Sequence, residues 1–272
     1  MFAALYFLGV APFHPTAEPT REMLFEGVEY TREVHRTPRP MVVHILRIDL
    51  DAEGVRLFVT PPDSDCGAMV HARTTSEFVE QFGVQAAINA NYFRPFRPGL
   101  LVGYPRRGSP VEPVGLAASN GEIYSWRFWR PGAVFICPEN TVQFTRPGRY
   151  HTMINGNGFI LRNGKQVELP PNGPYPRAAF AVSEDHREVL LVVVDGRQRR
   201  YSEGATLEEL ADILLRLGAH TAVRLDEGGS ATLAAEGPNG SPQVLNRPID
   251  SRIPGRERPV ANHLGVFAKP LQ

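Results

Sequence analysis

Two acidic residues stand side by side in the segment RLDEGGSATLAA, which covers residues 224–235. Asp226 and Glu227 leave one apolar run, and a Gly-Gly-Ser triplet separates them from the next. Paired carboxylates at a pocket can perform acid–base chemistry or stabilise an oxocarbenium ion. The glycines would let the backbone approach a ligand and point successive N–H groups at one anion. A tight surface turn is the alternative, and both interpretations stay open on this stretch alone.

A third acid, Asp195, ends the apolar run in VVVDGRQ. Between it and Asp226 lies TLEELADILLRLG, which predicts an amphipathic helix because Thr206 and Glu209 have capping-box spacing and Gly218 follows the last apolar position. The order is therefore strand, helix, strand. If the two strands pair in parallel, their carboxyl ends share one edge of a sheet, where open sheets bind ligands. Two turns whose carboxylates bond their own backbone remain the alternative.

Arginines and asparagines supply the other polar candidates. A guanidinium group is a planar donor suited to phosphate, although most arginines are simply solvated. The arginines considered are Arg177, Arg197, Arg247 and Arg258. The asparagines at strand ends or in glycine-containing segments are Asn89, Asn91, Asn155, Asn157, Asn246 and Asn262. Turn formation explains some of these, but it explains Asn89 poorly because that residue lies inside an apolar strand.

Motifs for several other chemistries are missing from the sequence. The eight histidines show no H-E-x-x-H spacing, and there is no G-x-S-x-G elbow and no phosphate-binding P-loop. Cys66 and Cys137 are too few for a metal cluster, and we expect two free thiols rather than a bridge. We therefore expect no catalytic metal and no cofactor. With 29 basic and 29 acidic residues, the sequence argues against a general nucleic-acid or anionic-membrane binder.

The 25 Gly and 25 Pro predict many turns and short strands. MVVHILRIDL and VRLFVT are β-rich runs separated by DAEG, which predicts a hairpin. Residues 74–83 predict a short helix, and residues 84–93 a buried strand. Asn-Gly pairs at 120–121 and 163–164 predict hairpin turns. The irregular segment 94–115, rich in Pro, Gly and Arg, is expected to be functional or mobile.

No internal repeat or composition break divides the chain. We predict an α+β (mixed α/β) fold in a single domain, with a β-dominated mixed sheet, a strand–helix–strand unit and flanking helices. The domain is expected over residues 41–269. Residues 1–40 are expected to form an apolar arm or signal-like segment and an extended entry. The apolar run is too short to span a bilayer. It favours export over a cytoplasmic location and no stable membrane insertion.

Several ordered segments resemble the phosphodiester glycosidase family. The run from YPRAAF through VVVDGRQ and TLEELADILLRLG to RLDEGGSATL resembles that family's P-R-T-A-like strand start, V-D-G-R segment, T-L-E-E-L-type helix and L-D-G-G-G-S turn. AINANYF, INGNGFILRNGK and RPVANHLGVF resemble three further segments, so the similarity extends from about Met41 to Phe267. The resemblance implies a mixed α/β sheet domain that cleaves a sugar–phosphodiester linkage at the anomeric carbon.

The residues and the resemblance together give a candidate site. The predicted catalytic residues are Asp226, Asp195, Glu227 and Arg177. The predicted substrate-binding residues are Asn89, Asn91, Asn155, Gly156, Arg197, Gly228, Gly229, Ser230, Asn246, Arg247, Arg258 and Asn262. Glu227 departs from the family, which usually has Gly there, and Asn91 stands where Gly or Asp is common. Both departures leave the substrate open.

The leading hypothesis is a glycosidase that acts on a phosphate-linked sugar or a related anionic carbohydrate. Asp226 would stabilise or attack the developing oxocarbenium carbon, and Asp195 or Glu227 would activate water. Arginines, with Arg177 as first candidate, would stabilise the leaving phosphate. One alternative is a non-catalytic binding module for anionic sugars or cell-wall polymers. Another is a metal-dependent phosphodiesterase, for which Asp226 and Glu227 are the only evident ligand candidates. The oligomeric state is left open.

Overall fold

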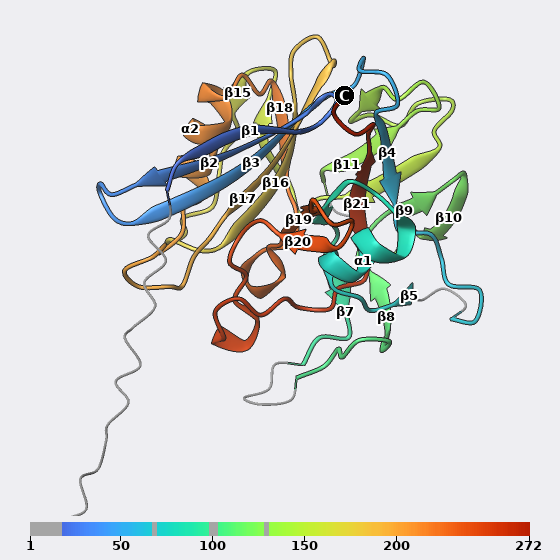
Figure 1. The fold of residues 1–272 in the computed structure, drawn as a ribbon. Helices are drawn as coiled ribbons and strands as arrows, with labels where there is room; N and C mark the ends of the chain where they lie inside the picture. The colour runs from blue at the N-terminus through green and yellow to red at the C-terminus, as the bar shows by residue number, and fades with distance from the viewer. Residues whose placement is uncertain (1–17, 67–69, 98–102, 128–130) are drawn as a thin grey trace, which may run out of the picture.

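The computed structural model describes residues 18–66, 70–97, 103–127 and 131–272. Within these ranges the fold has two α-helices and four β-sheets (Figure 1). The expected α+β class with dominant β-structure is confirmed. The expected single mixed sheet is wrong, because all strand ladders in the described ranges are antiparallel and they form separate sheets. The N-terminal apolar run lies outside the described residues. None of the helices seen is long and apolar enough to cross a membrane.

The largest sheet has eight strands. Their order is β1 (Thr20–Phe25), β2 (Val28–His35), β3 (Met41–Asp49), β17 (Glu188–Val194), β16 (Arg177–Val182), β18 (Thr221–Arg224), β14 (Phe159–Arg162) and β15 (Lys165–Gln166). β1 and β2 occupy the segment expected to be an extended entry, so two strands of this sheet precede the domain start predicted at Met41.

Two five-stranded sheets and one small sheet complete the β-structure. One has the order β10 (Glu122–Ser125), β9 (Ala117–Ser119), β13 (Thr152–Asn155), β11 (Ala133–Ile136) and β12 (Val142–Gln143). The other has the order β20 (Pro242–Val244), β19 (Leu233–Glu236), β6 (Ala86–Asn89), β21 (His263–Phe267) and β4 (Arg56–Val59). The small sheet has the order β5 (Val70–His71), β8 (Pro110–Pro113) and β7 (Phe93–Arg94).

The central strands of the eight-stranded sheet are buried on both faces. In β17, Leu191 and Val193 point into a core shared with both five-stranded sheets, whereas Val192 and Val194 point to the opposite face, under α2 (Leu207–Arg216). This period-two alternation explains why the strand reads as a continuous apolar run. The helix α1 (Thr75–Phe82) covers the outer face of the sheet that contains β6. Apolar packing thus occupies both faces of these strands, so the polar side chains that could bind a ligand lie at the strand ends.

Both helices begin and end as their sequences predict. Thr74 with Glu77 and Thr206 with Glu209 form complete capping boxes at the starts of α1 and α2. Gly83 caps α1 in the left-handed region, at φ 62°. The two Asn-Gly turns are also confirmed, between β9 and β10 and between β14 and β15.

The predicted hairpin around DAEG is wrong. β3 pairs with β2 and β17, whereas β4 pairs with β21 in another sheet. The turn therefore carries the chain from one sheet to the next. The local pattern cannot reveal this, because each β-rich run has a stronger partner elsewhere in the chain.

β17, α2 and β18 follow one another as expected, but the two strands do not pair. β16 lies between them and is antiparallel to both. β17 and β18 therefore run in the same direction, and their carboxyl ends reach the same edge of the sheet. This edge also receives the start of β16.

Candidate active site

Three of the predicted catalytic residues lie along this edge. Arg177 is the first residue of β16 and is paired with Val194, directly before Asp195. Asp226 comes two residues after β18. The end of β6 joins them from the neighbouring sheet, where the Asn89 Nδ2 donates to the main-chain oxygen of Asp226 at 2.7 Å. The sheet topology thus brings together residues that are far apart in the chain.

Asp195 is buried and its carboxylate is saturated with donors. His44 Nε2 lies 2.9 Å and the Tyr201 hydroxyl 3.0 Å from Oδ2, and the Asn246 Nδ2 donates to Oδ1 at 2.9 Å. The main-chain N–H of Arg247 reaches both oxygens at 3.0 Å. Burial alone would raise the pKa of Asp195, but His44, Asn246 and Arg247 together hold it below its usual value. Asp195 is therefore built to remain ionised and to hold its neighbours in place.

Asp226 is as deeply buried but has fewer donors. The main-chain N–H of Glu227 donates to Oδ1 at 2.9 Å, and the Ser230 hydroxyl bonds the same carboxyl group. Burial raises the pKa of Asp226 to about 7, against the lowering effect of Ser230 and the nearby Arg258. A carboxyl group with this pKa changes its charge near neutral pH, as acid–base residues do.

Glu227, the residue that departs from the family pattern, forms a buried ion pair. Its Oε2 accepts from Arg177 Nη1 at 2.7 Å. The rest of the Arg177 guanidinium donates to the main-chain oxygens of Ala205, at 2.9 Å, and Gly173, at 3.0 Å, and to the side chain of Asn172. Arg177 is thus committed to protein partners, which does not fit its expected contact with the substrate phosphate.

The second oxygen of Glu227 is left without a partner. Oε1 is buried and has no hydrogen bond in the described part of the protein. Burial raises the pKa of Glu227, although Arg177 and Arg224 oppose the rise. Burial raises the pKa of the Tyr92 phenol above its usual range, and the negative charges of the nearby Glu227 and Asp226 add to this rise. Sequence reasoning missed Tyr92, which stands within AINANYF.

The predicted asparagines are buried and bonded to the protein. Asn91 Oδ1 accepts from the main-chain N–H of Asn155 at 3.0 Å and from Asn262 Nδ2 at 3.1 Å, and Asn262 Oδ1 accepts from the main-chain N–H of Asn91 at 2.9 Å. Asn246 donates to Asp195 and to the main-chain oxygen of Ala231, and it accepts from the main-chain N–H of Leu233 at the start of β19. These asparagines fix the backbone around the carboxylates, and their amides are occupied by these contacts.

The predicted glycines are required where the chain packs closely. Gly228 has φ 69° and lies against the Tyr175 ring. A Cβ on Gly229 would lie 2.4 Å from Nη2 of Arg258, and one on Gly156 would lie 2.6 Å from the main-chain oxygen of Arg224. The triplet forms the short 3₁₀ turn η1 (Gly228–Ser230). Its compactness brings Arg258 next to Ser230, with Nη1 to Oγ at 3.2 Å.

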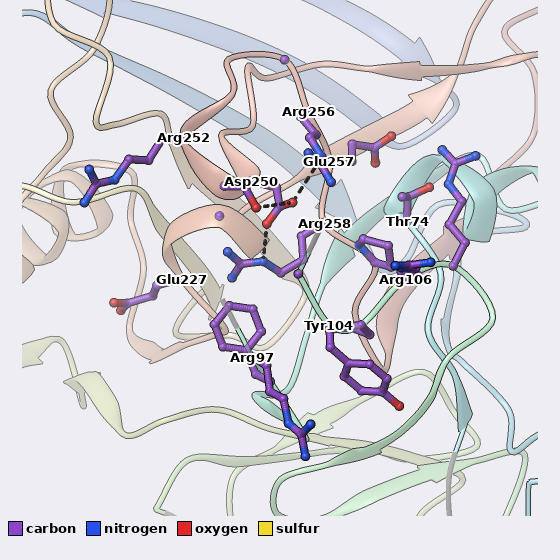
Figure 2. Close-up of a pocket in the computed structure, with 18 of the residues that line it drawn as sticks. Thr74, Arg97, Tyr104, Arg106, Glu227, Asp250, Arg252, Arg256, Glu257 and Arg258 are labelled. Carbon is purple, nitrogen blue, oxygen red and sulfur yellow. Dashed lines mark hydrogen bonds and ion pairs between the residues drawn. The ribbon is translucent and has the colours of Figure 1, made fainter. Parts of the chain in front are cut away.

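A cavity of about 1500 Å³ opens at this turn. Its lining is rich in arginine; the described ones are Arg97, Arg106, Arg107, Arg197, Arg252, Arg256 and Arg258. Three acids, Glu227, Asp250 and Glu257, also line it, so these residues leave an excess of four positive charges. Figure 2 shows Glu227 on one side and Tyr104 and Arg106 on the other, with Arg258 between them.

Two arginines are held in place beside Glu227. Arg258 donates from Nε to Asp250 Oδ1 at 2.8 Å (Figure 2), and its guanidinium lies over the Phe96 ring at 4.5 Å. Arg197 lies over the Tyr175 ring at 4.1 Å and bonds the Tyr175 hydroxyl. Fixed guanidinium groups of this kind can neutralise a phosphate.

Only part of the predicted site lines the cavity. Of the predicted residues, Glu227, Gly229, Arg197 and Arg258 line it. The remainder lie behind this surface or beside it, where most of them hold the loops. The sequence did not single out the other five arginines or the aromatic residues. The sequence feature that came closest to indicating them was the segment 94–115, which was expected to be functional or mobile. It contributes Phe96, Arg97 and Tyr104 to the lining.

The other chemistries considered have little support at this cavity. One group of three possible metal ligands is found in the described ranges, Asp65, Cys66 and His71, and none of these residues lines the cavity. The lining acids are Glu227, Asp250 and Glu257, and Asp250 is paired with Arg256 and Arg258, so the excess of arginine repels cations. Both cysteines are free, as expected.

The comparisons with known proteins agree with this geometry. The family model for phosphodiester glycosidases matches residues 82–267. The catalytic domain of zebrafish N-acetylglucosamine-1-phosphodiester alpha-N-acetylglucosaminidase, auto-inhibited by its pro-peptide, has a similar fold. Its TM-score is 0.64 at 18% identity, over 93% of this chain and 88% of that one.

Two further solved structures share the fold. A hypothetical protein from Synechocystis has a TM-score of 0.61 at 16% identity, over 89% of this chain; our chain spans 62% of its length. A protein from Burkholderia pseudomallei K96243, named as a presumed exported protein, has a TM-score of 0.57 at 15% identity, over 84% of this chain and 74% of that one. No protein of curated function matches the sequence. The family match covers more than half of the chain, and we conclude that the protein belongs to the phosphodiester glycosidase family.

Proposed function

We propose that the protein hydrolyses a sugar–phosphodiester linkage at the anomeric carbon. One observation carries this proposal. A buried carboxylate oxygen without a partner, Glu227 Oε1, belongs to a residue that lines an arginine-rich cavity and directly follows Asp226, whose pKa is raised by burial. Carboxylates suit a developing oxocarbenium ion, and guanidinium groups suit a phosphate that leaves with negative charge.

In the proposed reaction the bond between C1 of the sugar and the phosphate oxygen breaks, and the oxygen keeps the electron pair. The ionised Asp226, which is buried and does not itself line the cavity, stabilises the positive charge that develops at C1 through its own negative charge. A water molecule adds to C1 as Glu227 Oε1 accepts its proton, and the ion pair with Arg177 Nη1 orients this carboxylate. The products are the free sugar and a phosphate monoester. Phosphate is a competent leaving group, so a strong general acid is not needed.

The proposal reassigns two residues from the sequence hypothesis. Asp195 acts as a positioning residue, because its carboxylate is already bonded by His44, Asn246 and Arg247. The phosphate contact passes from Arg177 to Arg258 and Arg197, which line the cavity. Asp195 supports them indirectly by fixing the segment that follows β20.

The zebrafish neighbour's name places its activity in the same reaction class. We also propose that the protein is exported from the cytoplasm, and the name of the Burkholderia neighbour supports this. Locating the full-length protein in fractionated cells tests it, and recovery only in the cytoplasm would contradict it.

A panel of glycosyl phosphodiesters that differ in sugar tests the reaction, with free sugar as the readout and ¹⁸O-labelled water present. We expect the label in the sugar, and loss of turnover with retained binding in Asp226→Asn. Label in the phosphate would instead indicate cleavage of the P–O bond. Binding without release of sugar from any substrate would establish the non-catalytic binding module.

A further inference from the structure

The cavity carries more positive charge than one phosphodiester requires. The chain as a whole is neutral, with 29 basic and 29 acidic residues, so the excess of arginine in the cavity is local. A phosphodiester has one negative charge, and Arg258 with Arg197 is sufficient to neutralise it. The remaining arginines need another explanation.

Several of these arginines have no carboxylate partner. Arg256 and Arg258 share Asp250, and Arg107 pairs with Glu77 at 3.1 Å. For Arg97 and Arg106 no ion pair exists within the described ranges. Both side chains are exposed and line the cavity. They are therefore available to an anion.

The backbone that carries Arg97 and Arg106 is ordered by specific contacts. Arg97 and Tyr104 exchange two main-chain hydrogen bonds of 2.9 Å, and the Tyr104 hydroxyl donates to the main-chain oxygen of Pro110 at 2.6 Å. The Arg106 N–H donates to Ser109 Oγ at 3.0 Å. Both arginines thus extend from backbone held by hydrogen bonds. In Figure 2, Arg106 lies on the opposite side of the cavity from Glu227, and Arg97 lies along its lower edge.

The size of the cavity leaves room for more than a sugar and one phosphate. At about 1500 Å³ it exceeds the usual range for small-molecule sites, which is roughly 300–1000 Å³. A single sugar with one phosphate would occupy only part of it. An extended leaving group could reach from Glu227 to Arg97 and Arg106.

Three residues of the lining, two of them arginines, have a strained backbone. Arg197, Ser251 and Arg252 have φ values of 58°, 52° and 63°, in the left-handed region that non-glycine residues rarely adopt. All three line the cavity. Strain of this kind tends to persist at functional sites.

We propose that the cavity has a second anion subsite, formed by Arg97 and Arg106, and that the substrate's leaving group carries a further phosphate or equivalent anion. This inference rests on the proposed function, since it describes the far end of the same substrate. It identifies the substrate class as a glycosyl phosphodiester with at least two anionic groups, such as a fragment of a phosphate-linked polymer.

Calorimetric binding of two probes tests the subsite without turnover. The probes are 1,3-propanediol bisphosphate and propyl monophosphate, at about 0.15 M salt, where distant charges are screened. We expect the wild type to bind the bisphosphate at least tenfold more tightly. The double variant Arg97→Gln/Arg106→Gln should reduce this preference to below threefold. A matched double variant, Arg21→Gln/Arg187→Gln, removes two exposed arginines outside the cavity and should keep the preference.

Turnover separates this inference from the proposed function. Two substrates share a glycosyl propyl phosphodiester, and one has an added terminal phosphate. A preference in kcat/KM for the second, lost in the Arg97→Gln/Arg106→Gln variant, supports both. Equal turnover of both substrates with no preference in binding overturns the second subsite and leaves the reaction standing. No turnover, with the bisphosphate preference intact and dependent on the two arginines, overturns the reaction and leaves the subsite standing.

Discussion

Asp195 and Asp226 follow strands that run in the same direction in one sheet, and both are almost fully buried, at 1% and 6% exposed. Their pKa values nevertheless shift in opposite directions. Four neighbouring groups donate to Asp195, whereas Asp226 has one main-chain donor and one hydroxyl. Burial by itself therefore does not set the direction of the pKa shift. The number of donors determines whether the pKa of such a buried carboxyl group is lowered or raised.

The largest effect is expected at Asp226. Asp226→Asn should lower kcat/KM for a glycosyl phosphodiester about a thousandfold, because the amide cannot supply negative charge at the reacting carbon. Release of sugar measures the loss. Asp212→Asn is the matched control, since Asp212 is exposed on α2. Activity within tenfold of the wild type would remove Asp226 from the reaction.

Asp195→Asn should act mainly on stability. Its amide would turn an NH₂ group toward donors from His44, Asn246 and Arg247, at an expected cost of about 3 kcal/mol in the free energy of unfolding. Urea denaturation measures this. Because the folded pKa of Asp195 is lowered, its contribution is fully present above the unfolded value of about 3.9 and is lost as pH falls through the folded pKa. A stability equal to that of Asp212→Asn would contradict the structural role.

Glu227→Gln should lower kcat/KM about a hundredfold, because Oε1 could no longer accept a proton from water. The wild-type profile should rise to a plateau with an apparent pKa near 7, since Asp226 and Glu227 both act ionised. Glu227 raises the pKa of Asp226, so the variant's limb should move to lower pH. A limb that stays in place would show that the two carboxylates are not coupled.

Asp226→Asn should also change stability, with the opposite sign to Asp195→Asn. The folded pKa of about 7 exceeds the unfolded value, so the folded wild type binds more protons and loses stability as pH rises from about 4 to 7. Removing the carboxyl group removes this loss. At pH 8 the variant should be more stable by about 4 kcal/mol, and at pH 4 the difference should disappear. Lower stability at pH 8 would contradict the raised pKa.

The smallest effect is expected at the glycine turn. Gly229→Ala would place Cβ against the guanidinium of Arg258 and displace it from the cavity. We expect KM to rise about tenfold, the loss of one charge-assisted hydrogen bond, with little change in kcat. Gly148→Ala is the control, because that glycine, like Gly229, lacks a positive φ and has no atom near the added Cβ. Equal kinetics in the two variants would indicate that Arg258 does not bind the substrate.

The sequence could predict what depends on local pattern and chain order. Capping boxes defined both helices, and the positions of Asp195 and Asp226 after apolar runs predicted a shared sheet edge. Strand pairing could not be predicted in the same way. The position of β16 between β17 and β18, and the placement of β3 and β4 in different sheets, depend on partners far away in the chain.

The site itself was only partly predictable. Residue type suggested that the asparagines would contact a ligand, but burial directs their amides to main-chain groups of the protein. Arg177 looked like a phosphate ligand until the structure paired it with Glu227. The cavity arginines come from irregular segments, around 97–107 and 250–258, whose paths no periodic pattern fixes.

The cluster of Asn91, Asn155 and Asn262 has a consequence for the synthesis of the chain. Its hydrogen bonds join residues separated by 64 and 171 positions. β21, which follows Asn262, lies between β6 and β4 and completes their sheet. A ribosome must therefore have translated at least Phe267 before β6, the central strand of this sheet, can have both of its neighbours. Until then the main-chain N–H of Asn91 lacks its acceptor, Asn262 Oδ1, so we expect the nascent polypeptide to depend on late, long-range closure rather than stepwise folding from the N-terminus.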